Sequence, residues 1–190
     1  MNSAHYPKLH KAIKLALRSH KNQDRIEQIP MPYILHPIEV LSYVREIGKV
    51  IDEDVLCAAV LHDTIESHTV TKKEILERFG PRVTKIVLEL TRDEPSSKSL
   101  ACLSKNDAWE LRNRFFLDEI ENKMGPEAKL IKLADRLSNL RLAQYKRNGN
   151  KFDRYIKQTH AILELITRDI CPPLWDKLNE KLVSISTLNQ

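Results

Sequence analysis

The run Val55-Leu56-Cys57-Ala58-Ala59-Val60-Leu61 decides the fold of this chain, and it ends directly in the ionisable pair His62-Asp63. Asp52 precedes the run at a position suited to an N-cap, so we expect a helix from Asp52 to about Ser67. A second apolar stretch, Lys129–Ala134, leads in the same way into Asp135. Carboxylates seldom lie beside core-forming stretches unless they are paired or bind a metal.

A fourth ionisable residue, His36, opens a further apolar segment and completes a set with His62, Asp63 and Asp135. Two imidazoles and two carboxylates without a thiolate make a mixed nitrogen and oxygen site that suits a divalent transition metal. Neighbouring helix positions differ by about 100°, so His62 and Asp63 can both lean toward one ion. The sequence therefore predicts a metal site built from these four residues.

Two further polar residues follow the predicted ligands at helical spacing. Glu66 lies four residues after His62, and Asn139 lies four residues after Asp135, so each is expected on the same helix face. A carboxylate there can take a proton from a water, and an amide can orient a ligand. The alternative for both is an ordinary polar residue that points to solvent.

Composition favours an all-α fold. The 190 residues include only 4 Gly and 6% aromatic residues, with 42% hydrophobic and 30% charged residues. No glycine-rich phosphate-binding loop is present in the sequence. Helix periodicity and caps predict a bundle of about eight helices in a single domain over residues 1–190. The nine candidate segments lie near 7–20, 36–47, 52–67, 71–80, 81–92, 104–123, 126–146, 151–169 and 172–184. Residues 21–32 and 93–99 are expected to be connecting segments.

The net charge of +5 is unevenly distributed. Residues 1–50 and 141–190 each carry a net charge of +4, whereas residues 51–100 carry −3. Basic ends around an acidic middle suit a small polyanion held over a metal site, although most of the lysines are expected to form an ordinary solvated surface. No basic stretch interleaves with aromatic residues, so we do not expect nucleic acid as a partner.

The three cysteines Cys57, Cys102 and Cys171 are far apart and indicate neither a disulfide framework nor a CxxC metal site. The sequence shows no signal-peptide pattern at its start and no run of 18 apolar residues. We therefore expect a cytoplasmic protein without membrane association.

The four predicted ligands, in this order, resemble the HD superfamily of metal-dependent phosphohydrolases. Flanking segments are similar to the hydrolase domain of RelA/SpoT proteins in particular, and together they cover most of residues 10–145. With no synthetase domain in the sequence, the resemblance is to free-standing small alarmone hydrolases, the group that includes the metazoan SpoT homologue. The matching segments are His20-Lys21-Asn22-Gln23-Asp24-Arg25, Pro32-Tyr33-Ile34-Leu35-His36-Pro37, Ala58-Ala59-Val60-Leu61-His62-Asp63-Thr64-Ile65-Glu66, Arg78-Phe79-Gly80 with Val83, and Lys132-Leu133-Ala134-Asp135-Arg136-Leu137-Ser138-Asn139-Leu140-Arg141.

The resemblance implies an enzyme that hydrolyses the 3′-pyrophosphate of ppGpp or pppGpp to give GDP or GTP and pyrophosphate. It also implies one Mn²⁺ per chain, bound by His36, His62, Asp63 and Asp135. Glu66 would help to activate the water. The nucleotide would contact Arg25, Asn139 and Tyr155.

The chain departs from the family pattern beside the catalytic acid. Ser67 stands where the family has a second carboxylate, so we count Glu66 and Ser67 together as the catalytic positions. A serine can hydrogen-bond a water but cannot act as a carboxylate base. The residue after Arg25 is the apolar Ile26 instead of a basic one, and residues 95–125, with the candidates Lys105, Arg112 and Arg114, match poorly.

These departures leave two alternatives open. The first is an HD phosphohydrolase that acts on another nucleotide, such as (p)ppApp or NADPH. The second is a catalytically weak nucleotide sensor that keeps the metal. The sequence does not specify the oligomeric state.

Overall fold

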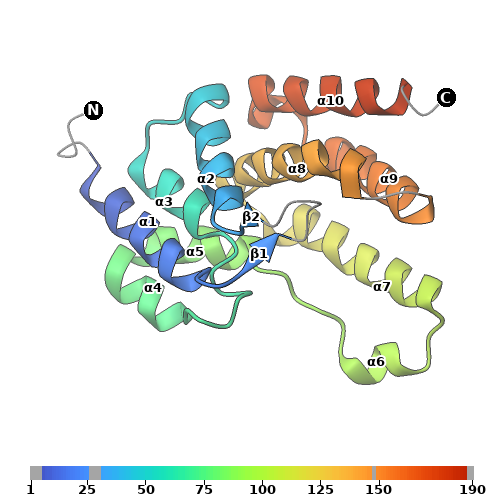
Figure 1. The fold of residues 1–190 in the computed structure, drawn as a ribbon, viewed down its shortest axis with the longest axis horizontal. Helices are drawn as coiled ribbons and strands as arrows, with labels where there is room; N and C mark the ends of the chain where they lie inside the picture. Colours follow the sequence, from blue (N-terminus) through green and yellow to red (C-terminus); the bar gives the residue numbers. More distant parts are fainter. Residues whose placement is uncertain (1–5, 26–30, 147–148, 188–190) are drawn as a thin grey trace.

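The computed structural model describes residues 6–25, 31–146 and 149–187, and helices dominate these residues (Figure 1). Ten α-helices lie in the described ranges, together with short π-helical and 3₁₀ segments and one pair of two-residue strands. The α-helices are α1 (Pro7–Ser19), α2 (Leu35–Ser42), α3 (Glu53–Leu61), α4 (Lys72–Phe79), α5 (Pro81–Leu90), α6 (Ser97–Ala101), α7 (Lys105–Asp118), α8 (Pro126–Lys146), α9 (Asn150–Leu165) and α10 (Pro172–Thr187). The π-helical segments Tyr43–Ile47 and Glu119–Lys123 continue α2 and α7, and a 3₁₀ turn spans Arg168–Ile170. The all-α fold class is confirmed.

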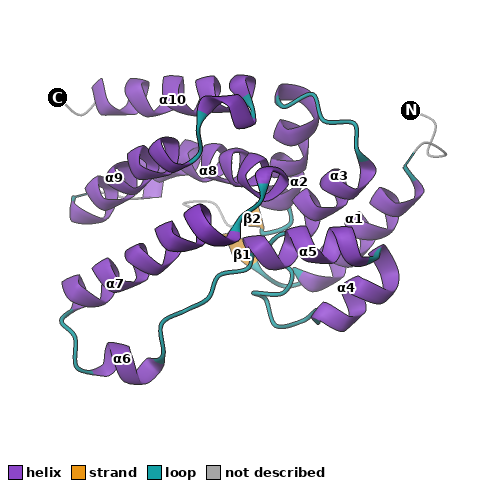
Figure 2. Ribbon diagram, turned by 180° about the vertical axis from the view of Figure 1, so that it is seen from behind, coloured by secondary structure: helices purple, strands orange, loops and turns teal. Residues whose placement is uncertain are grey.

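Helix α3 is the centre of the core. Every residue from Val55 to Leu61 is buried, and α1, α2 and α5 pack around the helix. Helix α8 packs between α2, α5 and α10, so that α2 lies beside both α3 and α8 (Figures 1 and 2). Helix α6 buries none of its residues and lies with α7 at the edge of the molecule (Figure 2). This packing brings α2, α3 and α8 together, and these helices carry the predicted ligands.

Helix α3 ends at Leu61, so the expectation of a helix to about Ser67 is wrong. Two side-chain hydroxyl groups donate to backbone carbonyls that would accept backbone N–H groups in a continuing helix. Thr64 Oγ1 donates to the Leu61 carbonyl at 2.7 Å, and Ser67 Oγ donates to the Thr64 carbonyl at 2.7 Å. Short side chains of this kind compete with the helical backbone for its hydrogen bonds. His62 therefore caps the helix, and Asp63 and Glu66 lie on the turns that follow.

The connecting segments hold more structure than the sequence indicated. Within residues 21–32, β1 (Asp24–Arg25) pairs antiparallel with β2 (Met31–Pro32). Within residues 93–99 the short helix α6 begins, with Ser96 as its N-cap. Local hydrogen bonds form both features, and apolar periodicity does not reveal them because they bury little surface.

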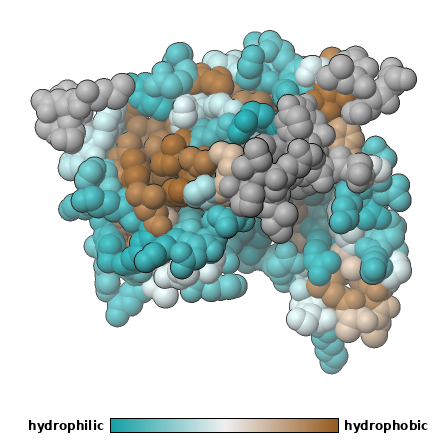
Figure 3. All heavy atoms as spheres, viewed as in Figure 1, coloured by the Kyte–Doolittle hydropathy of each residue, from teal (hydrophilic) through white to brown (hydrophobic). Residues whose placement is uncertain are grey.

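The surface seen in Figure 3 is mostly hydrophilic, with apolar side chains gathered on the side formed by α1, α2 and α3. Leu17, Leu35 and Ile51 are among the exposed apolar residues. Among the described helices, none combines the length and the apolar character that crossing a bilayer requires.

Candidate active site

The four predicted ligands converge on one point between α2, α3 and α8. His36 Nε2 lies 3.2 Å from Asp135 Oδ1 and 3.6 Å from Asp63 Oδ2. His62 Nε2 lies 3.1 Å from Asp63 Oδ2 and 3.9 Å from Asp135 Oδ1. Donor atoms of His36, His62 and Asp135 all lie within 4.8 Å of one another. Residues about 100 positions apart in the sequence thus present two nitrogens and two carboxylates to a single volume.

Both imidazoles direct Nε2 toward this point because Nδ1 is engaged elsewhere. His62 Nδ1 lies 2.8 Å from the Ala59 carbonyl, which can only accept, so Nδ1 carries the hydrogen. His36 Nδ1 lies 2.9 Å from Ser138 Oγ. His62 Nε2 is buried and makes no aligned hydrogen bond. A buried, unsatisfied nitrogen beside two carboxylates is the donor set that a divalent ion requires.

Electrostatics in the cluster are dominated by the two buried carboxylates. Burial opposes a positive charge on His62, but Asp63 and Asp135 outweigh it and raise the pKa of His62 to about 9. At His36, burial is the larger effect and lowers the pKa. Burial also opposes the charge on Asp135, yet the Lys132 ammonium and His36 hold its pKa well below its usual range. The site therefore keeps ionised carboxylates that attract a cation.

Further side chains orient these carboxylates. The Tyr33 hydroxyl donates to Asp63 Oδ2 at 2.8 Å, and Lys132 Nζ donates to Asp135 Oδ2 at 3.0 Å. Asn139 Nδ2 donates to Asp135 Oδ1 at 2.6 Å. Arg25, a predicted substrate-binding residue, extends this network of hydrogen bonds, since its Nη2 donates to Asn139 Oδ1 at 2.9 Å.

The two predicted catalytic positions are neighbours with different surroundings. Glu66 Oε1 accepts the backbone N–H of Arg92 at 2.9 Å. Burial raises the pKa of Glu66, and the nearby Asp63 charge adds to this effect. Ser67 Oγ, in contrast, lies 2.7 Å from both Ser19 Oγ and Thr69 Oγ1, in a cluster of hydroxyl groups.

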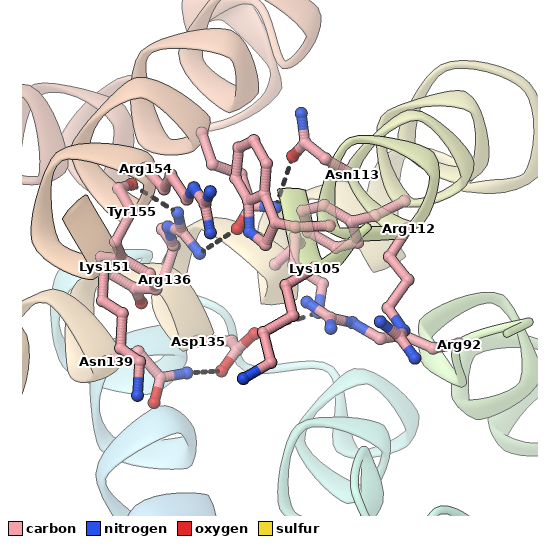
Figure 4. A pocket seen from close by; sticks show the side chains of 14 residues that line it. Arg92, Lys105, Arg112, Asn113, Asp135, Arg136, Asn139, Lys151, Arg154 and Tyr155 are labelled. Atoms are coloured by element: carbon pink, nitrogen blue, oxygen red, sulfur yellow. Dashed lines mark hydrogen bonds and ion pairs between the residues drawn. The ribbon is translucent and has the colours of Figure 1, made fainter. Parts of the chain in front are cut away.

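A cavity of about 650 Å³ opens beside Asp135 (Figure 4). Residues from α7, α8 and α9, together with Arg92 after α5, line it. Asp135 is the acid among these residues, and seven lining side chains are cationic: Arg92, Lys105, Arg112, Lys132, Arg136, Lys151 and Arg154. In Figure 4, Arg92 and Arg112 lie on one side of Asp135, and Lys151 and Arg154 lie on the other. The cavity suits a ligand with several negative charges.

Several of these cations are held by neighbours. Arg136 donates to Thr159 Oγ1 at 2.8 Å, and its guanidinium lies 3.6 Å from the ring centroid of Tyr155. The guanidinium of Arg154 lies 4.9 Å from the Trp109 ring. Across the described chain, by contrast, neither Lys105 nor Lys151 has an ion-pair partner. These two ammonium groups remain available to a ligand.

The structure brings most of the predicted site residues to this region. Asn139 and Tyr155 line the cavity, and Arg25 contacts Asn139. The candidates Lys105 and Arg112 line it too, whereas Arg114 is exposed and is not a lining residue. Sequence reasoning assigned no role to the remaining five cations of the wall: Arg92, Lys132, Arg136, Lys151 and Arg154. Lys132 and Arg136 lie in the matched segment Lys132–Arg141, and Lys151 and Arg154 lie in the basic residues 141–190. Arg92 has no comparable sequence signal.

Known proteins share the family and the fold of this chain. The model of the HD domain family matches residues 12–164. A solved structure, described as a metazoan ortholog of SpoT that hydrolyzes ppGpp and plays a role in starvation responses, superposes with a TM-score of 0.78 at 31% identity. The match covers 93% of this chain and 94% of that one. The protein lmo0812 of Listeria monocytogenes shares the fold, with a TM-score of 0.60 at 24% identity.

Curated relatives have similar degrees of identity. The human guanosine-3′,5′-bis(diphosphate) 3′-pyrophosphohydrolase MESH1 is 38% identical over 130 residues, which are 68% of this chain and 66% of that protein. The GTP pyrophosphokinase rsh of Brucella melitensis is 31% identical over 199 aligned positions, which cover 96% of this chain. The chain spans 25% of the length of that relative.

Proposed function

We propose that this chain, which belongs to the HD domain family, is a phosphohydrolase that removes the 3′-pyrophosphate from the guanosine alarmones ppGpp and pppGpp. One observation carries the proposal: His36, His62, Asp63 and Asp135 converge beside a cavity that Asp135 lines and whose wall holds seven cationic side chains. The human relative is named for this activity, and the metazoan SpoT ortholog is described as hydrolysing ppGpp.

The same four residues would bind one Mn²⁺ per chain. Their nitrogen and carboxylate donors, and the unsatisfied Nε2 of His62, support a divalent transition metal. When bound, the ion would act as a Lewis acid on a water and neutralise charge on the phosphates. Tyr33, Lys132 and Asn139 already hold the two carboxylates in place through hydrogen bonds.

Glu66 is the proposed general base. One of its oxygens is held by the Arg92 N–H, and its raised pKa makes it a stronger base than an exposed glutamate. Water attacks the phosphorus next to the ribose 3′ oxygen, and the bond between that oxygen and phosphorus breaks. Glu66 accepts one proton of the water, the ribose oxygen gains a proton as it leaves, and pyrophosphate is released. Ser67, the second proposed catalytic position, replaces the family's other acid and would hydrogen-bond the water without accepting its proton.

The nucleotide would occupy the cavity. Asn139 and Arg25, linked at 2.9 Å, and Tyr155 are the proposed contacts nearest to the metal site. The cations of the wall would bind the phosphates, because each guanidinium or ammonium group can donate charge-assisted hydrogen bonds.

We further propose that residues 1–190 form one domain and that the protein acts in the cytoplasm on a small-molecule substrate. Contacts that run from α1 through α3, α5 and α8 to α9 and α10 support the first point. The free thiols of Cys57, Cys102 and Cys171 support a location in the cytoplasm, where thiols stay reduced.

A nucleotide panel tests the proposed function. The full chain is incubated in Mn²⁺ with ppGpp, pppGpp, ppApp or NADPH, and the nucleoside product and the released phosphate species are identified. We expect GDP or GTP together with pyrophosphate. Turnover of ppApp or NADPH alone would assign the same site to another nucleotide. Binding of ppGpp without any product would indicate a nucleotide sensor instead of an enzyme.

A further inference from the structure

Behind His36, two side chains form a hydrogen-bonded chain that leads away from the metal ligands. Ser138 Oγ lies 2.9 Å from His36 Nδ1 and donates to Glu39 Oε2 at 2.6 Å. His36 and Ser138 are only 2% and 0% exposed, so water does not compete for this contact. His36 and Glu39 come from α2, whereas Ser138 comes from α8, three residues after Asp135. These hydrogen bonds therefore link α2 and α8, the two helices that carry His36 and Asp135.

The direction of these hydrogen bonds sets the tautomer of His36. A hydroxyl group has one hydrogen, and Ser138 gives it to the Glu39 carboxylate, which can only accept. Ser138 then faces His36 with a lone pair, so the hydrogen between them must belong to Nδ1. His36 Nε2 keeps its lone pair and faces Asp135 and Asp63. Only this tautomer can bind a metal through Nε2.

Glu39 is itself held in one orientation. Its Oε1 accepts from the Tyr43 hydroxyl at 3.0 Å and lies 2.9 Å from Arg141 Nε. Oε2 is thereby left for Ser138. His62 differs from His36 in this respect, since the backbone carbonyl of Ala59 holds its Nδ1. Of the two histidines, His36 is thus the one whose orientation depends on side chains that substitution can remove.

We propose that Glu39 and Ser138 are positioning residues of the metal site, which hold His36 in the tautomer and orientation that bind the ion. The inference rests on the proposed function, because the metal belongs to that proposal. Partners behind a ligating histidine typically contribute about 10–100-fold to metal affinity.

The two residues have different consequences when they are lost. Ser138→Ala leaves His36 Nδ1 without its acceptor. Glu39→Leu leaves the Ser138 hydroxyl free to turn and donate to Nδ1, which favours the tautomer with hydrogen on Nε2. Glu39→Gln keeps an oxygen that can accept from Ser138, so the amide should preserve most of the affinity.

The test is Mn²⁺ binding to the full chain without nucleotide, measured by isothermal titration calorimetry, with thermal unfolding recorded for each variant. We expect Ser138→Ala and Glu39→Leu each to weaken the affinity for Mn²⁺ by about 10–100-fold. Glu46→Gln removes one negative charge from the exposed side of the π-helical segment after α2 and serves as the matched control, with unchanged affinity. His62→Ala defines the loss caused by removal of a ligand.

The double variant distinguishes positioning from general destabilisation. Because both residues act through His36, Glu39→Leu combined with Ser138→Ala should bind Mn²⁺ about as weakly as the weaker single variant. Wild-type affinity in Ser138→Ala, or additive losses in the double variant, would overturn the inference. A wild-type chain that binds Mn²⁺ but leaves every alarmone intact would refute the proposed hydrolysis and leave the positioning role standing. A wild-type chain that binds no Mn²⁺ would refute both.

Discussion

Glu66 and Ser67 are adjacent in the chain, yet their side chains have separate partners. The Glu66 carboxylate is held by the Arg92 N–H and is influenced by Asp63, whereas the Ser67 hydroxyl lies among those of Ser19 and Thr69. In the proposed mechanism Glu66 is therefore the acid–base group. Position 67 offers a place where a second carboxylate would find two hydroxyl donors.

We predict that Glu66→Ala lowers kcat by about 10²–10⁴-fold, the usual contribution of a general base. Ser67→Asp should raise kcat with ppGpp more than it changes KM, because the added charge acts on the water and not on substrate binding. Initial rates across a range of pH check both variants. The raised pKa of Glu66 places the acidic limb of the wild-type profile above the pKa of an ordinary glutamate, with activity lost as pH falls.

Thr69→Ala is the control for Ser67→Asp, since it removes a hydroxyl from the same cluster without adding charge. Unchanged guanosine hydrolysis in Ser67→Asp at every pH would show that position 67 takes no part in activation of the water.

At the scale of the helix, Asp52 is the N-cap that binds the free backbone N–H groups at the start of α3. Asp52 Oδ1 accepts from the backbone N–H groups of Asp54 at 2.9 Å and Val55 at 3.2 Å, and Oδ2 accepts from Arg82 at 2.7 Å. Burial acts to raise the pKa of Asp52, but these hydrogen bonds outweigh it and lower the pKa. Ionised Asp52 therefore stabilises the native state.

We predict that Asp52→Ala lowers the free energy of unfolding by about 1 kcal/mol near neutral pH, the typical value of an N-cap. The pKa of Asp52 is lower in the folded state than in the unfolded state, so its contribution is present above the unfolded value. That contribution is lost as pH falls through the folded value. Urea unfolding at several pH values should show the two proteins converging in acid. Thr71→Ala, which removes the non-ionising N-cap of α4, should cost a similar amount at every pH.

At the scale of the whole molecule, the cavity exists because α7, α8 and α9 meet beside the metal site. Each of these helices contributes cations to the wall, and Asp135 of the predicted ligand cluster is one of its lining residues. The cations that would bind a charged ligand therefore come from these three helices and from Arg92, and each helix supplies only two of them. We therefore expect that substitution of a wall cation can weaken phosphate binding without loss of metal binding.

We predict that Lys151→Ala raises KM for ppGpp by about tenfold with little change in kcat. An ammonium group that binds phosphate at a distance from the reacting bond contributes equally to substrate and transition state. The effect should shrink as ionic strength rises. Lys157→Ala, an exposed lysine on the same helix outside the cavity, is the matched control. Equal KM values for the two variants would remove Lys151 from the phosphate site.

The local features of the sequence were sufficient to predict much of this protein. The apolar run Val55–Leu61 is the buried helix α3, and Thr71 caps α4 as its spacing indicates. The four predicted ligands were chosen from residue type and context, because a carboxylate next to a core-forming run requires a partner whatever the fold. These predictions depend on neighbours within a few positions, where helix geometry is the same in every protein.

Only the tertiary structure decided which distant residues meet. The Glu39–Ser138 hydrogen bond joins positions 99 residues apart, and the cations of the cavity come from separate helices. The end of α3 at Leu61 has a local cause, the Thr64 hydroxyl that binds the Leu61 carbonyl, but the contact of the Ser67 hydroxyl with Ser19, 48 residues away, was decided by the tertiary structure. Side-chain periodicity specifies which face of a helix is buried, but the packing of helices against one another determines what that face contacts.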